Sequence, residues 1–191
     1  MNKISTDICV IGGGAGGLSV AAGAVQLGAR VVLFECGTMG GDCLNRGCVP
    51  SKALLAAAKA AHNAHGNPAM GVTGATPSVD FAAVKAHVAA VIAALAPHDS
   101  KDRFEQLGVT VIPEMARFAS RSKVVSDSFQ VTAKFFIIAT GSAPLIPPLP
   151  GLDKVPFHTS DSIFADTTKP EHLLIIGGGP IGVEMARAHH R

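Results

Sequence analysis

The stretch Asp7–Glu35, DICVIGGGAGGLSVAAGAVQLGARVVLFE, decides the fold of this 191-residue chain. Its two apolar runs predict buried strands, and the alanine-rich run between them predicts a helix. In order, we expect a strand at 7–11, a glycine turn at 12–17, a helix at 18–27 ended by Gly28, and a strand at 30–34 that leads into Glu35. This alternation predicts an α/β protein with a three-layer, Rossmann-like domain.

The turn between the first strand and helix has the spacing G-x-G-x-x-G, with glycines at Gly12, Gly14 and Gly17. Such glycines permit a tight turn, a close approach to a pyrophosphate, and close packing of helix on strand, and the phosphates lie at the helix N-terminus. Ala15 and Gly16 complete the turn. Glu35 lies where this fold places an acid on a ribose hydroxyl. We therefore predict a dinucleotide site.

A second informative stretch is 40–52, GGDCLNRGCVPSK, which holds Cys43 and Cys48. Pro50 suits a first helical turn, so we expect the alanine-rich run 52–64 to be a helix that begins beside the cysteines. A helix N-terminus and the nearby cation of Lys52 stabilise a thiolate. The pair is therefore interpreted as a redox-active dithiol, with a plain disulfide or two unlinked thiols as the alternatives.

The run from Ile8 to Lys52 resembles the flavoprotein disulfide reductases, which include dihydrolipoamide dehydrogenase, glutathione reductase and mercuric reductase. The resemblance implies that the first glycine turn binds FAD and that Glu35 holds the adenosine ribose. It also implies that Cys48 faces the flavin as the charge-transfer thiolate, that Cys43 exchanges with substrate, and that Lys52 lies near flavin N5. Further FAD contacts are implied at Gly41, Asp42, Ala116, Ala139, Thr140, Gly141 and Ser142.

The sequence departs from the common family pattern at four places, one of which is Thr38, where a basic residue is often found after the ribose glutamate. Glu114 stands where a glycine is often found two residues before Ala116, and Asp42 replaces the more usual threonine. Arg46 is a bulky cation between the two cysteines. Its side chain either favours a thiolate or points into solvent, and the sequence leaves both open.

The middle of the chain predicts further helices and strands. Ser78 is a candidate N-cap for a helix from Val79 to Leu95, which Pro97 should end. We then expect a helix at 99–107, a strand at 109–112, short antiparallel strands at 116–118, 123–126 and 129–134, and a fully buried strand at 135–139 (FFIIA).

A second G-x-G-x-x-G, with glycines at Gly177, Gly179 and Gly182, follows a predicted strand at 172–176 and opens a helix. The resemblance implies that this turn binds NAD(P)H and that Glu184 lies near the nicotinamide. We expect an FAD domain at 1–150, a linker at 151–170 and the start of a NAD(P) domain at 171–191. The chain is then interpreted as the N-terminal portion of a longer reductase, inactive alone.

Composition limits the partners. A formal net charge of +2 without a basic block argues against nucleic acid, and no apolar run looks long enough to span a bilayer. We see no leader peptide and expect a cytoplasmic protein. Cys9 is expected to be buried in the first strand. The histidines lack partners at ligand spacing, so no metal site is predicted.

The parent function that these features indicate is a pyridine nucleotide-disulfide oxidoreductase that acts on a small dithiol or disulfide, of the dihydrolipoamide dehydrogenase type. The alternatives are an enzyme of the mercuric or glutathione reductase type and a non-catalytic flavin-binding or thiol redox module. The resemblance implies a homodimeric parent whose dimerisation domain is not among these residues.

Overall fold

The computed structural model describes residues 1–191, and the chain divides into two compact units. Unit 1 consists of Met1–Asn45 and Ala94–Ala143, and unit 2 of Arg46–Ala93 and Pro144–Arg191. Each unit therefore draws on two separate stretches of the sequence.

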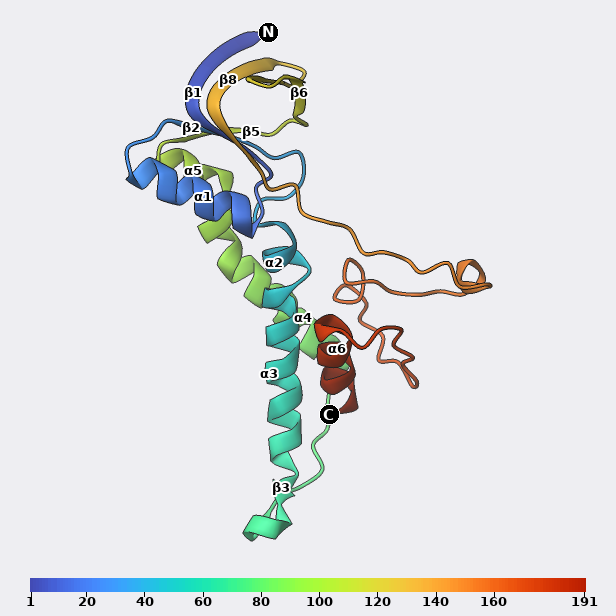
Figure 1. The fold of residues 1–191 in the computed structure, drawn as a ribbon. Helices are drawn as coiled ribbons and strands as arrows, with labels where there is room; N and C mark the ends of the chain where they lie inside the picture. The colour runs from blue at the N-terminus through green and yellow to red at the C-terminus, as the bar shows by residue number, and fades with distance from the viewer. The chain divides into compact units, whose positions relative to one another are not determined.

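Unit 1 is built on a six-stranded sheet with the strand order β5-β2-β1-β8-β7-β6. The first four strands in that order are parallel, and β8, β7 and β6 are antiparallel neighbours. The two longest, β1 and β8, curve side by side in Figure 1. The strands are β1 (Asn2–Ile11), β2 (Val31–Phe34), β5 (Val109–Ile112), β6 (Arg117–Ser120), β7 (Lys123–Val125) and β8 (Phe129–Ile138).

The sheet separates two hydrophobic clusters, because successive side chains of a strand point to opposite faces. On one face Val10 and Leu33 pack with the helices α1 (Ala15–Gln26) and α5 (Lys101–Gln106). On the other face Cys9 and Phe34 pack with residues of β7 and β8, the antiparallel side of the same sheet. The predicted α/β domain with a Rossmann-like, mainly parallel sheet is therefore confirmed.

The apolar run 135–139 differs from its prediction. It is the second half of the ten-residue strand β8, and it is not fully buried, because Phe135 is 67% exposed and Ile138 is 68% exposed. Since β7 pairs with β8 only at residues 130–132, this half of the strand has β1 as its one neighbour. Apolar character alone did not distinguish a fully buried strand from one that is partly exposed on both faces.

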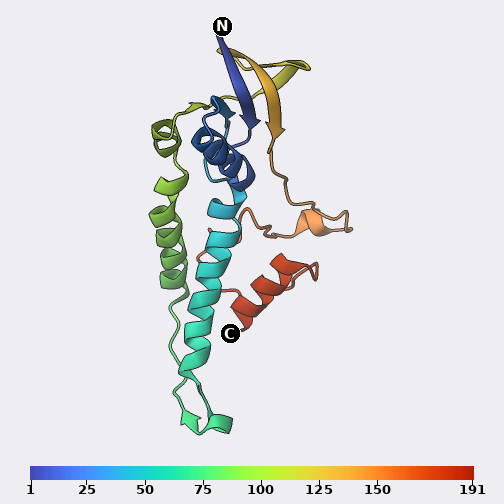
Figure 2. The same cartoon turned by 60° about the vertical axis from the view of Figure 1, so that its left-hand side comes forward.

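Unit 2 contains α3 (Cys48–Ala64), most of α4 (Phe81–Leu95) and α6 (Pro180–His190). The three helices share a cluster formed by Ala53, Leu54, Val88, Met185 and Ala188. A small hairpin, β3 (Gly66–Asn67) and β4 (Val72–Thr73) with the 3-10 turn η1 (Pro68–Met70), follows the end of α3 (Figure 2). The helix α3 begins at Cys48, four residues before the start that the sequence predicted.

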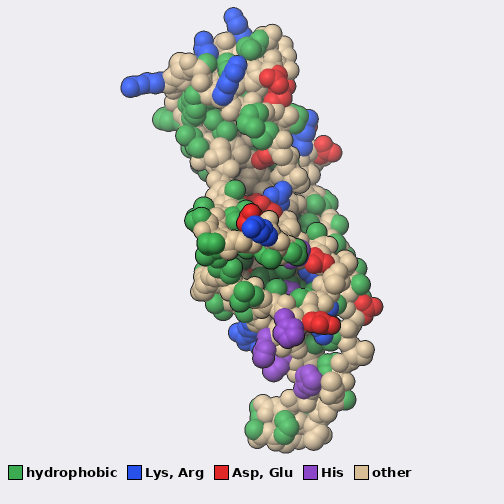
Figure 3. Space-filling view, turned by 90° about the vertical axis from the view of Figure 1, so that its right-hand side faces the viewer, with side chains coloured by type: hydrophobic (Ala, Val, Ile, Leu, Met, Phe, Trp, Pro, Cys, Tyr) green, Lys and Arg blue, Asp and Glu red, His purple; other side chains and the backbone are tan.

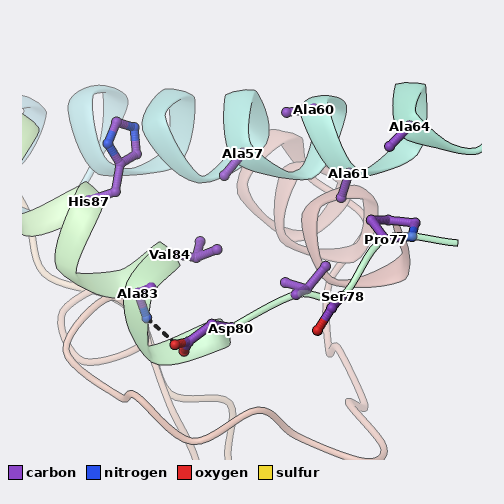
Figure 4. Close-up of a pocket in the computed structure, with 11 residues that line it drawn as sticks. Ala57, Ala60, Ala61, Ala64, Pro77, Ser78, Asp80, Ala83, Val84 and His87 are labelled. Carbon is purple, nitrogen blue, oxygen red and sulfur yellow. Dashed lines mark hydrogen bonds between the residues drawn. The ribbon is translucent and has the colours of Figure 1, made fainter. Parts of the chain in front are cut away.

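The N-terminus of α4 is capped by Asp80 and not by Ser78. The Asp80 carboxylate accepts a hydrogen bond from the Ala83 N–H at 3.0 Å (Figure 4). The helix begins at Phe81, so Asp80 holds the position from which a side-chain oxygen reaches the first turn. Ser78 lies two residues too early. At the other end, Pro97 falls in the 3-10 turn η2 (Ala96–Asp99) that follows Leu95, as predicted.

Two further expectations are corrected. The strand predicted at 172–176 does not form, because no segment of the chain pairs with these residues. The helical stretch Phe81–Gln106 is long and apolar enough to pass a length-and-composition test for a membrane span. Of the residues in the tested window, 11% are buried. The expectation that no run is long enough was therefore wrong on that criterion, which helices of soluble proteins also meet.

Candidate functional site

The first glycine turn is closed so tightly that only glycine fits at two of its positions. Gly12 has φ +110°, and a Cβ placed on it would lie 2.1 Å from the Ala139 carbonyl oxygen. A Cβ on Gly17 would lie 1.8 Å from the Gly12 carbonyl oxygen, so the third glycine lets α1 pack directly on the turn. Gly14 is the N-cap of α1 and no side chain caps this helix. This geometry suits a dinucleotide phosphate.

Glu35, at the end of β2, is held beside the same turn. Its Oε2 accepts a hydrogen bond from the Gly13 N–H at 2.6 Å, and its Oε1 accepts one from the Gly37 N–H at 2.6 Å. The carboxylate is thus fixed by two backbone donors, a detail that the spacing in the sequence did not reveal. Each oxygen keeps a further lone pair that could accept from a ribose hydroxyl.

Two other segments predicted to contact the cofactor meet the turn within unit 1. The Gly40 N–H donates to the Gly13 carbonyl at 2.9 Å, and a Cβ on Gly41 would lie 2.7 Å from the Gly14 Cα. The Ala139 N–H donates a hydrogen bond to the Ile11 carbonyl oxygen at 2.8 Å. Gly41 begins the short helix α2 (Gly41–Asn45), which the sequence did not predict. Asp42 is exposed in its first turn, and 140–142 follow Ala139 as exposed chain.

Ala116 packs against the other face of the sheet, in the cluster that contains Phe34 and Ile112. The unusual Glu114 beside it has a structural contact: its carboxylate accepts the Ser128 N–H at 2.9 Å. Hydrogen bonds, chiefly from the Ser126 side chain, lower the pKa of Glu114. Glu114 therefore stabilises the turn between β7 and β8 by this hydrogen bond.

Cys43 is half-buried in α2 and Cys48 is the exposed first residue of α3. Cys36 is exposed. Cys9 is fully buried, and burial raises the pKa of its thiol to about 12, which confirms it as a core residue.

Figure 3 shows histidine side chains gathered in the lower part of the view. Across residues 1–191, no group of three histidine, cysteine, aspartate or glutamate side chains is close enough to hold a metal ion.

Lys52 and Glu184, both in unit 2, form an ion pair. Lys52 lies one turn after Cys48 on α3, and Glu184 lies on α6 directly after the second glycine turn. The hydrogen bond from Lys52, and then that from Ser51, lower the pKa of Glu184 against the opposing effect of partial burial. The sequence predicted a site role for each residue but not that they meet.

We expect the Glu184→Gln variant to lose a pH-dependent part of its stability. Because the folded-state pKa of Glu184 lies below its ordinary value of 4.5, its contribution is present above that pH and is lost as the pH falls through the folded-state pKa. The pair is largely exposed, so the loss at pH 7 should be about 0.5 kcal/mol. Urea unfolding of both proteins at pH 7 and pH 4 should show the difference shrinking in acid. Equal stabilities at pH 7 would contradict it.

The second glycine turn repeats the geometry of the first. Gly177 has φ +116°, and a Cβ on Gly182 would lie 2.2 Å from the Gly177 carbonyl oxygen. A residue of the preceding segment lies 3.2 Å from that Cβ in both turns, Val10 in the first and Ile175 in the second. Gly179 is the N-cap of α6, without a side-chain cap. The turn thus has this geometry although 173–176 form no strand.

A groove of ≈ 460 Å³ lies elsewhere in unit 2, between α3 and the start of α4 (Figure 4). Small apolar side chains dominate its walls, with Ser78, Asp80 and His87 as polar members. None of the predicted site residues lines it. The chemistry suggested by the motifs therefore lies outside this groove.

The fold and the two glycine turns define a dinucleotide-binding α/β protein. The sequence profile described as "Pyridine nucleotide-disulphide oxidoreductase" matches residues 6–191. The mercuric reductase of Streptomyces lividans is 39% identical over 191 residues, and that of Lysinibacillus sphaericus is 34% identical over 190 residues. A solved structure of the flavoprotein disulfide reductase RclA from Escherichia coli, a Cu(II) complex, superposes with a TM-score of 0.79 at 26% identity over 96% of this chain.

The chain belongs to the pyridine nucleotide-disulphide oxidoreductase family. It aligns along 97% of its length with the Streptomyces lividans relative but covers 40% of that relative, 35% of the Lysinibacillus sphaericus one and 39% of the RclA chain. Members of the family bind FAD and depend on a pyridine nucleotide. The tight first turn, its uncapped helix and the fixed Glu35 fit the FAD of such proteins.

Proposed function

We propose that these residues form the FAD-binding, dithiol-bearing part of a flavoprotein disulfide reductase that uses NAD(P)H. The observation that carries the proposal is the pair of glycine turns with one geometry, Gly12–Gly17 and Gly177–Gly182. An enzyme that moves electrons between two dinucleotides needs one such turn for each. In this proposal the first turn holds FAD and the second holds NAD(P)H.

The roles of the chain's own residues follow from their chemistry. The N-terminus of α1 would bind the pyrophosphate, and Glu35 would accept hydrogen bonds from the ribose. FAD, when bound, supplies a carrier that accepts a hydride from NAD(P)H and passes on two electrons. The Cys43–Cys48 disulfide would take up those two electrons with two protons and become a dithiol. Lys52, oriented by Glu184, would place a cation beside the reacting centre.

Within the family, we propose a substrate that exchanges two electrons with the Cys43–Cys48 pair. The reduced pair would reduce such a substrate, or the reduced substrate would convert the disulfide back into the dithiol. A lipoamide-type dithiol suits a Cys43–Cys48 pair that cycles between disulfide and dithiol. Mercuric ion is the second candidate, favoured because the curated relatives named above are mercuric reductases. Such a dithiol also suits the reducing cytoplasm, where the proposal places the protein.

The test is an absorbance spectrum of the purified chain after addition of FAD and then of a reducing dithiol. We expect bound flavin, and on reduction a new long-wavelength band from the Cys48 thiolate against the flavin. The Cys48→Ser variant should lose that band and the Cys36→Ser control should keep it, because Cys36 has no role in the dithiol. A folded chain that takes up no FAD would overturn the proposal that these residues hold the cofactor.

A further inference from the structure

Residues 158–166, HTSDSIFAD, form a compact turn that we call the aspartate turn. His158 bridges its two ends, since its Nε2 lies 3.0 Å from Asp166 Oδ2 and its Nδ1 lies 3.2 Å from Ser162 Oγ. Ser162 Oγ also accepts the Thr159 N–H at 3.2 Å, and the Ile163 N–H donates to the Thr159 carbonyl at 3.0 Å. This part of the predicted linker therefore has a defined conformation.

The aspartate turn is fastened to the helices of unit 2. Lys85 on α4 is 4% exposed and its Nζ donates to the Ile163 carbonyl at 2.6 Å. Ile163 and Phe164 pack against the cluster formed by residues of α3, α4 and α6. The turn thus has a polar anchor and an apolar anchor.

The anchored turn presents Asp161 to the segment between the cysteines. Asp161 Oδ1 lies 3.2 Å from Arg46 Nη1, and both side chains are partly exposed. Arg46 comes two residues before Cys48, whose exposed thiol is at the N-terminus of the 17-residue helix α3. All of these residues belong to unit 2.

Four charged side chains therefore lie along or against the start of α3, and they form two pairs. Arg46 pairs with Asp161, and Lys52 pairs with Glu184. Each cation near Cys48 in the sequence is offset by a carboxylate from the distant segment 161–184. A cation stabilises a thiolate and an anion destabilises it, so the balance of these charges sets how readily Cys48 ionises.

We infer that Asp161 is a positioning residue that tunes Cys48: it holds Arg46 in place and offsets its positive charge, which lowers the fraction of Cys48 present as thiolate. This rests on the proposed function, in which Cys48 is a reactive thiol, and it adds a regulator of that thiol. The thiolate is the nucleophile in disulfide exchange.

The inference predicts opposite effects for the two partners. Asp161→Asn leaves Arg46 without its counter-charge, so the thiolate fraction rises. Arg46→Gln leaves Asp161 without its counter-charge, so the thiolate fraction falls. For a unit charge on Arg46, only two residues from Cys48 along the chain, or on its partner Asp161, in water-like surroundings, either change is expected to be about two- to threefold. A pair that acted only by holding the loop would change the reactivity in the same direction when either partner is removed.

The experiment measures the alkylation rate of Cys48 in the reduced 191-residue chain without cofactor. Iodoacetamide forms a carbon–sulfur bond with the thiolate and releases iodide, and fragment-ion mass spectrometry assigns the product to Cys48 and not to Cys43. At pH 7 and low salt we expect Asp161→Asn to react about two- to threefold faster and Arg46→Gln about two- to threefold slower. Both differences should shrink in 1 M salt.

Two controls complete the test. The charge-swapped variant Arg46→Asp/Asp161→Arg should return to the wild-type rate, because the net charge is restored. Glu105→Gln, which removes the carboxylate of the Lys101–Glu105 pair in unit 1, should have no effect. Unchanged rates in both single variants, or a change of the same sign in both, would overturn the inference. Because the assay contains no FAD, a failure to bind FAD would leave this result intact.

Discussion

Gly17→Ala is expected to lower the free energy of unfolding of unit 1 by about 3 kcal/mol. The added Cβ would lie 1.8 Å from the Gly12 carbonyl oxygen and 3.2 Å from the Val10 side chain. The near neighbour is backbone, which cannot rotate away as a side chain can. To accommodate the methyl group, α1 must move off the end of β1, and the turn must open.

The matched control is Gly16→Ala, one position earlier in the same helix. A Cβ on Gly16 would have no heavy atom within 4 Å. Alanine is the better helix former, so this variant should be as stable as the wild type or about 0.5–1 kcal/mol more stable. Urea unfolding followed by circular dichroism compares the two variants. If Gly17→Ala lost no more stability than Gly16→Ala, the tight closure of the turn would be disproved.

Phe34→Ala is expected to cost about 3–5 kcal/mol, the range for removing a buried aromatic ring. Phe34 is 1% exposed and belongs to the cluster on the sheet face opposite α1 and α5. Its strand, β2, lies between β1 and β5, with Phe34 aligned to Ile11 and Ile112. The surrounding strands are fixed by hydrogen bonds, so the cavity can collapse only in part.

Phe135→Ala is the matched control, a ring of the same size in the same sheet. Phe135 is 67% exposed, so its removal should change the free energy of unfolding by less than about 0.5 kcal/mol. Urea midpoints of the two variants test the difference. A large loss in Phe135→Ala would contradict the exposed position of the second half of β8.

Local patterns predicted much of unit 1 because they are decided by neighbours in the sequence. The strand at 109–112 has the predicted bounds, and the glycine turn lies between a strand and a helix as its spacing indicates. A G-x-G-x-x-G turn needs only its own backbone geometry and the adjoining helix. The same locality explains why Gly177 and Gly182 reproduce the turn while 173–176 have no strand partner.

What the sequence did not predict depends on distant contacts. The exposure of Phe135 depends on where β7 ends, and the ion pairs of Lys52 with Glu184 and of Arg46 with Asp161 join segments far apart in the chain. No spacing rule connects such residues. The prediction of the α4 cap was wrong for a local reason. Ser78 and Asp80 are both good capping residues, and only the start of the helix at Phe81 selects between them.

The pairing of β1 with β8 delays the completion of the sheet while the chain is being synthesised at the ribosome. Asn2 is aligned with Phe129 and Ile11 with Ile138, so β1 finds its longest partner only after residue 138 has been added. At the usual elongation rates that delay is on the order of ten seconds. During it the apolar edge of β1 has no partner strand on that side. The newly made β1 therefore has much to gain from chaperone protection during this interval.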